Sequence, residues 1–162
     1  MYEVKENFIT NVDEIMELVK QHEEQDCFTN RGIGGTDKHE TVYGESQFSS
    51  LYEKDMNDEL IETVWKTIPH ERKWCSQIVI NKYQSGDWLI RHQDSAGGYW
   101  KFKLVYLTQG KPHFKYWDKD DNEHLVQEKK GAMFEMPIDT WHEVTKMQQG
   151  EETKYSLCLI WE

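Results

Sequence analysis

The chain has 162 residues, with 30 acidic and 19 basic side chains and a formal net charge of −11. This length predicts a single domain built around one core. The mean hydropathy is low, at −0.87, but 7 Trp, 8 Tyr and 6 Phe can fill a compact core and argue against a disordered chain. The longest strongly apolar run, residues 157–161, is far shorter than the roughly 20 residues that a membrane-spanning helix needs.

The N-terminal residues and the cysteines indicate a compartment. Residues 1–6 have neither a basic segment nor an apolar one, so we expect no secretory signal. The three cysteines, Cys27, Cys75 and Cys158, are far apart and form no C-x-x-C pair. A disulfide framework and a cysteine zinc site are therefore both disfavoured, and the expected location is the reducing cytoplasm.

The negative charge is concentrated in the first half of the chain. Residues 1–70 carry 16 acidic and 6 basic side chains, whereas residues 71–162 carry 14 and 13. We interpret the acidic half as a solvated surface. Because an acidic protein repels phosphates, nucleic acid is a disfavoured partner.

The first half of the chain has the pattern of two helices separated by a loop. Residues 11–26 place apolar side chains on one helical stripe behind acidic residues in the first turn. Residues 30–47 lack periodicity and hold four of the ten glycines, which predicts a loop that could close over a site as a lid. A second helix is predicted over residues 57–68, where Pro69 ends it.

After residue 75 the pattern changes to short strands with turn residues between them. The predicted strands are residues 76–83, 88–94, 100–108, 113–117, 125–128, 132–136, 140–147 and 154–161. Eight short strands at this spacing indicate a β-sandwich or barrel, with the two helices packed on one outer face. We therefore predict an α+β fold with a double-stranded β-helix, or jelly-roll, core. In this single domain, residues 1–75 form a helical support with the lid, and residues 76–162 form the jelly-roll core that carries the site.

Three side chains in the strand region are candidate metal ligands. His92 and Asp94 lie two residues apart on a predicted strand, where i and i+2 face the same side, and His142 follows about fifty residues later. The similar pair His22 and Glu24 lies on a predicted helix, where the two side chains diverge. Two imidazoles and one carboxylate are the ligands of non-haem Fe(II) oxygenases, although zinc uses the same ligand types. The alternative is a surface pair at His92 and Asp94 with a core histidine at 142.

Lys154 is a candidate anchor for a bound anion. It shares one face of the last predicted strand with Ser156, Cys158 and Ile160, so it points inward if that face is buried. An interior lysine is costly unless an anion pairs with it, and the distal carboxylate of 2-oxoglutarate would be such an anion. Ser156 and Tyr83, with Asn81 beside it, could add hydrogen bonds. The alternative is a lysine at a strand end in solvent.

At this point the residues resemble a known family. Residues 81–94 are similar to the N-x-Y-x-x-G-x₅-H-x-D motif of Fe(II)/2-oxoglutarate-dependent dioxygenases, in particular the prolyl 4-hydroxylase-like branch. Residues 131–137, 142–144 and 154–157 resemble the closing strands of that family. The resemblance implies a jelly roll that uses Fe(II), 2-oxoglutarate and O₂, with no catalytic protein group beyond the metal centre. It implies His92, Asp94 and His142 as iron ligands and Lys154, Tyr83, Ser156 and Asn81 as cosubstrate-binding residues.

Two departures bear on the reaction and on the anchor. AlkB-type repair enzymes carry an R-x-N-x-T-x-R pattern on the last strand, whereas residues 154–160 read K-Y-S-L-C-L-I. Oxidation of nucleobases is therefore disfavoured. Some jelly-roll oxygenases place the cosubstrate lysine on the fourth strand, which makes Lys115 a second candidate beside Lys154.

The sequence says least about the substrate. Four side chains that flank the predicted site are candidate substrate-binding residues: Arg31, Arg91, Trp100 and Trp117. The first hypothesis is hydroxylation of a protein or peptide side chain, of prolyl or Asp/Asn type. The alternatives are a hydroxylase of a free amino acid or small metabolite, a nucleobase oxidase, and a non-catalytic jelly-roll module that binds a metal or another ligand. The remaining histidines, His39, His70, His113 and His124, are expected in solvent.

Overall fold

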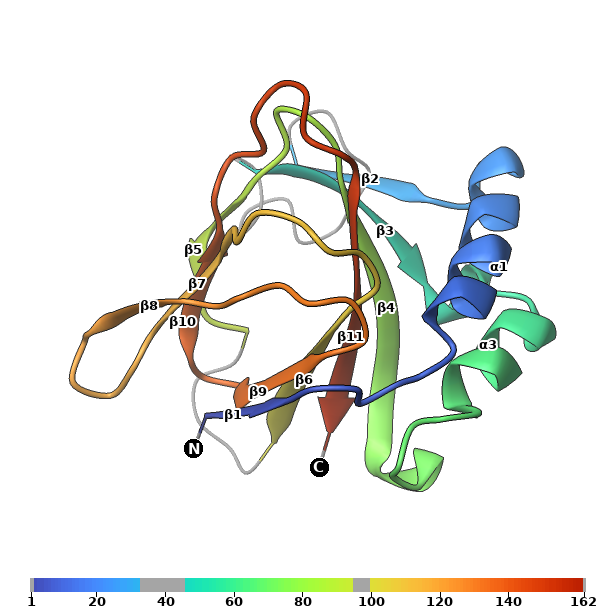
Figure 1. Cartoon of the computed structure of the whole chain (residues 1–162), viewed down its shortest axis with the longest axis horizontal. Helices are drawn as coiled ribbons and strands as arrows, with labels where there is room; N and C mark the ends of the chain where they lie inside the picture. Colours follow the sequence, from blue (N-terminus) through green and yellow to red (C-terminus); the bar gives the residue numbers. More distant parts are fainter. Residues whose placement is uncertain (1, 33–45, 95–99, 162) are drawn as a thin grey trace.

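Two antiparallel sheets face each other, and two helices cover the outer face of the larger one (Figure 1). The computed structural model describes residues 2–32, 46–94 and 100–161. In that part of the chain, the larger sheet has the strand order β1-β9-β6-β11-β4-β3-β2 and the smaller one β5-β10-β7-β8. This α+β jelly roll confirms the predicted fold class.

The larger sheet consists of β1 (Glu3–Lys5), β9 (Met133–Pro137), β6 (Lys101–Tyr106), β11 (Lys154–Trp161), β4 (Cys75–Tyr83), β3 (Gln47–Tyr52) and β2 (Thr29–Gly32). The smaller sheet consists of β5 (Leu89–His92), β10 (Trp141–Val144), β7 (Phe114–Trp117) and β8 (Glu123–Leu125). The helices are α1 (Val12–Glu24) and α3 (Asp58–Trp65), and single 3-10 turns lie at Glu53–Asp55 and Arg72–Trp74.

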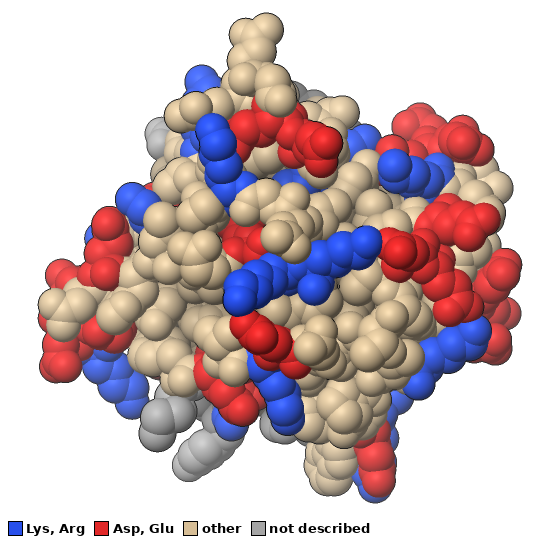
Figure 2. Space-filling view, viewed as in Figure 1, with Lys and Arg blue, Asp and Glu red and all other residues tan. Residues whose placement is uncertain are grey.

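Both predicted helices form, and each is amphipathic. α1 buries Ile15 and Val19 completely. Its acidic side chains face solvent, and Figure 2 shows acidic side chains gathered on the side of the molecule where the helices lie. α3 begins at the cap residue Asn57, whose side-chain oxygen accepts a hydrogen bond from the Leu60 amide at 2.9 Å. Within the described residues, neither helix has the length and apolar character that crossing a membrane requires.

Strand β11 lies between β4 and β6 and divides the interior into two layers. Its residues alternate, as strand geometry requires. Tyr155, Leu157 and Leu159 pack into the cluster beneath the helices, whereas Cys158 packs into the cluster between the sheets. The inner face of β11 therefore carries Lys154, Ser156 and Cys158, so the predicted sharing of one face by these residues is confirmed.

The segment between the helices differs from the prediction in part. Residues 30–32 belong to β2 and residue 47 to β3, whereas the sequence predicted a loop over 30–47. The proposed lid, residues 33–45, lies outside the described residues. β1 and β2 were not predicted because they are short and polar and pair only at the two edges of the larger sheet. β3, which lies between β4 and β2, was also not predicted. The predicted strand 125–128 is also shifted, because its pairing with β7 covers Glu123–Leu125.

Candidate metal centre

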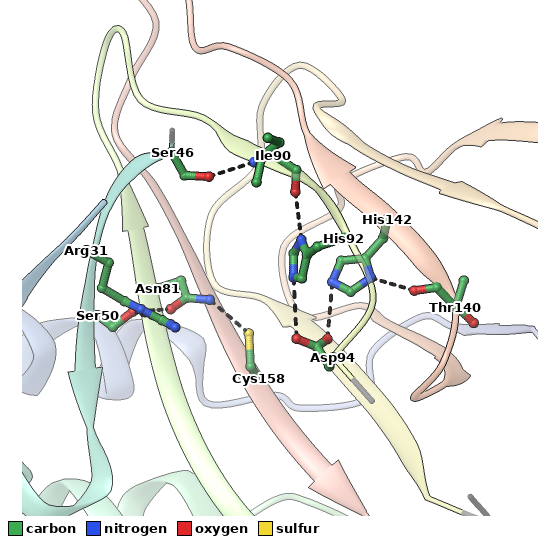
Figure 3. A network of polar contacts seen from close by, with 10 residues as sticks. All are labelled: Arg31, Ser46, Ser50, Asn81, Ile90, His92, Asp94, Thr140, His142 and Cys158. Carbon is green, nitrogen blue, oxygen red and sulfur yellow. Dashed lines mark hydrogen bonds and ion pairs between the residues drawn. The ribbon is translucent and has the colours of Figure 1, made fainter. Parts of the chain in front are cut away.

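The two candidate histidines lie on neighbouring antiparallel strands and directly face each other. His92 ends β5, and His142 on β10 is its register partner. Since opposite residues in a ladder point to the same face, both imidazoles project into the space between the sheets. Their ring centroids are 4.3 Å apart. Asp94 follows His92 by two residues, and its carboxylate points toward both imidazoles (Figure 3).

The three side chains bring one possible ligand atom each to the same small region. The Nε2 atom of His92 is 3.4 Å from Oδ1 of Asp94, and Nε2 of His142 is 3.3 Å from Oδ2. One ligand atom from each residue lies within 4.8 Å of the other two. The imidazoles are buried, whereas the Asp94 side chain is 20 % exposed. The predicted cluster is therefore present, with its accessible side at the carboxylate.

Backbone carbonyls orient both imidazoles. The Nδ1 atom of His92 lies 2.6 Å from the carbonyl oxygen of Ile90, and Nδ1 of His142 lies 2.8 Å from that of Thr140. A carbonyl can only accept, so each Nδ1 carries the proton and donates it. Nε2 is therefore the ring nitrogen that faces Asp94 in both histidines and the one that can offer its lone pair to a metal.

The charges in this cluster suit a divalent cation. Burial raises the pKa of Asp94, but the adjacent imidazoles of His142 and His92 outweigh it and hold this pKa well below its usual range. Burial lowers the pKa of His142, but the Asp94 carboxylate raises it by more, so this pKa lies above its ordinary value. The carboxylate is thus ionised and favours a proton on the imidazole that faces it. A metal ion that displaced this proton would meet two neutral imidazoles and one carboxylate, which is the donor set of non-haem iron sites. These residues fit a catalytic metal, because the cluster supplies three ligands from the described part of the chain and not the four of a closed structural zinc site.

A cavity of about 320 Å³ opens beside the three side chains. Its walls come from both sheets and include Phe102, Ile138 and Cys158. Thiol burial raises the pKa of Cys158 to about 12, so this residue is a neutral, apolar wall at physiological pH. The volume lies at the lower end of the range for small-molecule sites.

Arg31 forms part of the same cavity wall. Its side chain is 9 % exposed, and the guanidinium lies over the Phe48 ring at 4.9 Å. A chain of hydrogen bonds links it to the inner face of the barrel (Figure 3). Arg31 donates to the Ser50 hydroxyl at 3.3 Å, Ser50 donates to the Asn81 amide oxygen at 2.6 Å, and the Asn81 amide donates to the Cys158 sulfur at 3.3 Å. Arg31 and Asn81 are therefore both held at the cavity.

Lys154 points into the barrel, where Glu128 is its ion-pair partner. The side chain is nearly fully buried, and its Nζ lies 2.6 Å from Oε1 of Glu128. Burial lowers the pKa of Lys154, and the Glu128 carboxylate opposes this shift. The pair lines a second cavity of about 410 Å³ and does not line the metal cavity. Glu128 was not identified from the sequence, because no motif or strand spacing relates it to Lys154.

Ser156 lies between this ion pair and the metal cavity. It shares the inner face of β11 with Lys154 and Cys158, and strand geometry separates those two by about 13 Å. Tyr83 is the register partner of Lys154 on β4, and Lys154 Nζ lies 5.7 Å from the ring centroids of both Tyr83 and Tyr106. Of the three predicted helpers, Tyr83 lies beside Lys154, Ser156 lies two residues along the same strand, and Asn81 lies in the wall of the metal cavity.

Tyr106 is a further polar residue of the barrel interior that the sequence did not single out. Its hydroxyl is fully buried and has no hydrogen-bond partner among the described residues. Burial and the nearby Glu128 raise the pKa of Tyr106 well above its usual value, so the hydroxyl keeps its proton. A buried donor in this position is costly unless a ligand accepts from it.

Arg91, Trp117 and Trp100 are outside the cavity lining. Arg91 precedes His92 on β5 and therefore points to the opposite, outer face of the smaller sheet. There its guanidinium stacks on Trp117 at 3.9 Å and lies 3.4 Å from Asp121. Trp100 is 37 % exposed at the start of β6. Because neighbouring residues on a strand face opposite sides, the sequence already indicated that Arg91 points away from the side of His92.

Lys115 and His113 lie in different environments, Lys115 on the outer surface and His113 in the interior. Lys115 lies on β7 with its side chain 27 % exposed, and pairs with Glu123 at 3.5 Å on the outer surface. His113 was expected in solvent, but this expectation is wrong, because its ring is buried between Thr145 and Glu151, each 2.8 Å away. Long-range packing of two loops buries His113, and this cannot be read from local sequence.

Comparison with known proteins gives structural matches only. No family model and no curated protein matches the sequence. Among solved structures, a Pseudomonas putida prolyl-4-hydroxylase is 14 % identical with a TM-score of 0.66, covering 99 % of this chain and 92 % of that chain. A Trichoplax adhaerens prolyl hydroxylase, solved with a hypoxia inducible factor peptide fragment, is 13 % identical with a TM-score of 0.73, covering 99 % and 82 %.

A third match is the non-haem alpha ketoglutarate dependent carbocyclase SnoK from nogalamycin biosynthesis. It is 10 % identical with a TM-score of 0.77, covering 99 % of this chain and 79 % of that chain. The chain therefore has the fold of the 2-oxoglutarate-Fe(II) oxygenases, and its similarity to prolyl hydroxylases extends over nearly its whole length.

Asp94→Asn should abolish tight binding of a divalent metal, because it removes the carboxylate of the cluster formed by the described residues and leaves its two imidazoles. Asp121→Asn is the matched control, since Asp121 is a highly exposed partner of Arg91 on the outer face. Calorimetric titration with Mn(II), or with Fe(II) without oxygen, measures both. Unchanged metal affinity in the Asp94 variant would refute the centre.

Proposed function

We propose that the chain is an Fe(II)- and 2-oxoglutarate-dependent dioxygenase that hydroxylates a C–H bond. The observation that carries this proposal is the convergence of His92, Asp94 and His142 beside a cavity, within the fold of this enzyme class. The donor set, the orientation of both imidazoles and the accessible side of the cluster all suit a catalytic metal. A closed structural zinc site would require a fourth protein ligand.

The protein's part is to hold the reactants and to exclude water. His92, Asp94 and His142 would hold ferrous iron, which with 2-oxoglutarate and O₂ supplies oxidation of an unactivated C–H bond. The rigid β5–β10 ladder fixes the two imidazoles, and Phe102, Ile138 and Cys158 make the adjacent wall apolar. No protein acid or base is needed, so the chain acts by positioning.

Lys154 is the proposed anchor of the distal carboxylate of 2-oxoglutarate. An ammonium has three N–H donors, and Glu128 is its one ion-pair partner among the described residues, so donors remain for a second carboxylate. The buried hydroxyl of Tyr106 supports this assignment, because it lies near Lys154 and still requires an acceptor. Tyr83 and Ser156 complete the surroundings, with Asn81 in the cavity wall nearer the metal. Lys115 is the weaker candidate, since it pairs with Glu123 on the outer surface.

The proposed substrate is a protein or peptide side chain, of prolyl or Asp/Asn type. The metal cavity holds only about 320 Å³, part of which the cosubstrate would occupy, and this leaves space for one side chain. Arg31, in the wall of the cavity, is the proposed substrate-orienting residue. A substrate peptide would then extend outside the cavity, and the Trichoplax prolyl hydroxylase shows this fold together with a peptide.

A small metabolite is the second candidate, because the carbocyclase SnoK matches with a TM-score of 0.77. Succinate release from the Fe(II)-loaded protein with 2-oxoglutarate separates the two. Peptides that contain Pro, Asp or Asn should raise succinate release several-fold above the rate without substrate, whereas the free amino acids should not. Stimulation by free amino acids alone would favour the metabolite. Absence of both succinate release and iron binding would favour a non-catalytic module.

Lys154→Ala should raise the 2-oxoglutarate concentration needed for half-maximal succinate release by at least tenfold, because a charge-assisted hydrogen bond is lost. Lys115→Ala is the control and should leave this concentration unchanged, since Lys115 faces outward. The reverse pattern would move the anchor to β7.

Tyr106→Phe should weaken binding of 2-oxoglutarate by about fivefold or more, because it removes a neutral donor that the carboxylate would use. The same change should leave the unliganded protein equally stable or more stable, since it deletes a buried hydroxyl without a partner among the described residues. Calorimetry and urea unfolding measure the two effects. Reduced stability with unchanged affinity would assign Tyr106 a purely structural role.

A further inference from the structure

The lysine proposed to bind the cosubstrate already has a carboxylate within the protein. Glu128 Oε1 lies 2.6 Å from Lys154 Nζ, and both side chains are almost completely buried. This feature is separate from the metal cluster, because neither residue lines the metal cavity. Glu128 neutralises this buried ammonium in the protein without ligand, and it occupies one of the positions around Lys154 Nζ that a carboxylate of the cosubstrate would use.

Glu128 is fixed in place and does not depend on Lys154 for its position. Its Oε2 atom accepts hydrogen bonds from the backbone amides of His113 at 2.6 Å and Phe114 at 3.0 Å. Rotation away from the barrel would leave both buried amides without this acceptor, which is costly. The carboxylate therefore remains beside Lys154 when a ligand enters.

A second carboxylate at Lys154 would create a local excess of negative charge. The Lys154–Glu128 pair is neutral, and a distal carboxylate of the cosubstrate would place two anions beside one cation. Like charges repel strongly in a buried, low-dielectric setting. The remaining N–H donors of Lys154 and the Tyr106 hydroxyl can still donate hydrogen bonds to this carboxylate, but repulsion from Glu128 offsets part of the attraction.

We infer that Glu128 is a specificity-determining residue that competes with the distal carboxylate of 2-oxoglutarate for Lys154. This inference rests on the proposed function. Its consequence is weak binding of 2-oxoglutarate and poor discrimination against 2-oxo acids that have an uncharged tail. Because binding is weak, low concentrations of 2-oxoglutarate would not saturate the enzyme, and its activity would rise with the 2-oxoglutarate concentration.

Glu128→Gln tests this competition, because it removes the charge and keeps an oxygen acceptor for the two amides. 2-Oxoglutarate is titrated by calorimetry into the Mn(II)-loaded protein, which binds without turnover. The variant should bind at least tenfold more tightly than the wild type. Glu135→Gln is the matched control, since Glu135 forms an equally buried 2.6 Å ion pair with Lys103, away from both cavities. This control should leave the affinity unchanged.

A second measurement uses the wild-type protein and does not depend on folding of the variant. The affinities for 2-oxoglutarate and for 2-oxopentanoate, in which a methyl group replaces the distal carboxylate, should differ by less than about tenfold. A charge-assisted hydrogen bond without competition commonly gives a larger factor. A ratio of tenfold or more, or a Glu128→Gln protein that binds 2-oxoglutarate no more tightly, would overturn the inference while the proposed function stands. Failure of the wild type to bind Mn(II) or either 2-oxo acid would overturn both.

Discussion

The register between β5 and β10 is the constraint on which the rest of the site depends. It places His142 directly opposite His92, so that both imidazoles face the space between the sheets and Asp94 can reach them. A shift of one residue would turn one imidazole to the outer face, where Arg91 stacks on Trp117. The backbone carbonyls that orient the rings belong to the same two segments, so pairing and tautomer are set together.

Strand β11 connects this site to the stability of the domain. Its outer residues, such as Leu157, pack in the core beneath α1 and α3, while its inner residues border the barrel interior. The same strand thus carries part of the main apolar cluster and the buried Lys154. A buried ammonium destabilises a fold unless it is paired, and Glu128 supplies that pairing in the protein without ligand. If Lys154 also binds the distal carboxylate, as we propose, stability of the barrel without ligand and affinity for the cosubstrate are opposing demands on one lysine.

The polar residues of the barrel interior are arranged in two groups along this strand. Around Cys158 lie the metal ligands and the chain of hydrogen bonds from Arg31 to Asn81. Around Lys154 lie Glu128, Tyr83 and Tyr106. The first group suits a metal and a substrate side chain, and the second suits an anionic end group. This division is what the proposed cosubstrate, which has two different ends, would require.

The sequence by itself predicted the jelly roll and the two helices, because side chains alternate along strands and follow a stripe along helices. Strand alternation also made His92, Asp94 and His142 candidate ligands and Lys154 a candidate inward residue, and a family resemblance favoured these interpretations over the alternatives. The same parity would have excluded Arg91 from the site. Only the tertiary structure decided that Glu128 pairs with Lys154, that the Tyr106 hydroxyl is buried near it, and that Arg31 reaches the metal cavity from β2. Each of these contacts joins segments far apart in the chain, and their proximity depends on strand order and loop packing, which local patterns do not encode.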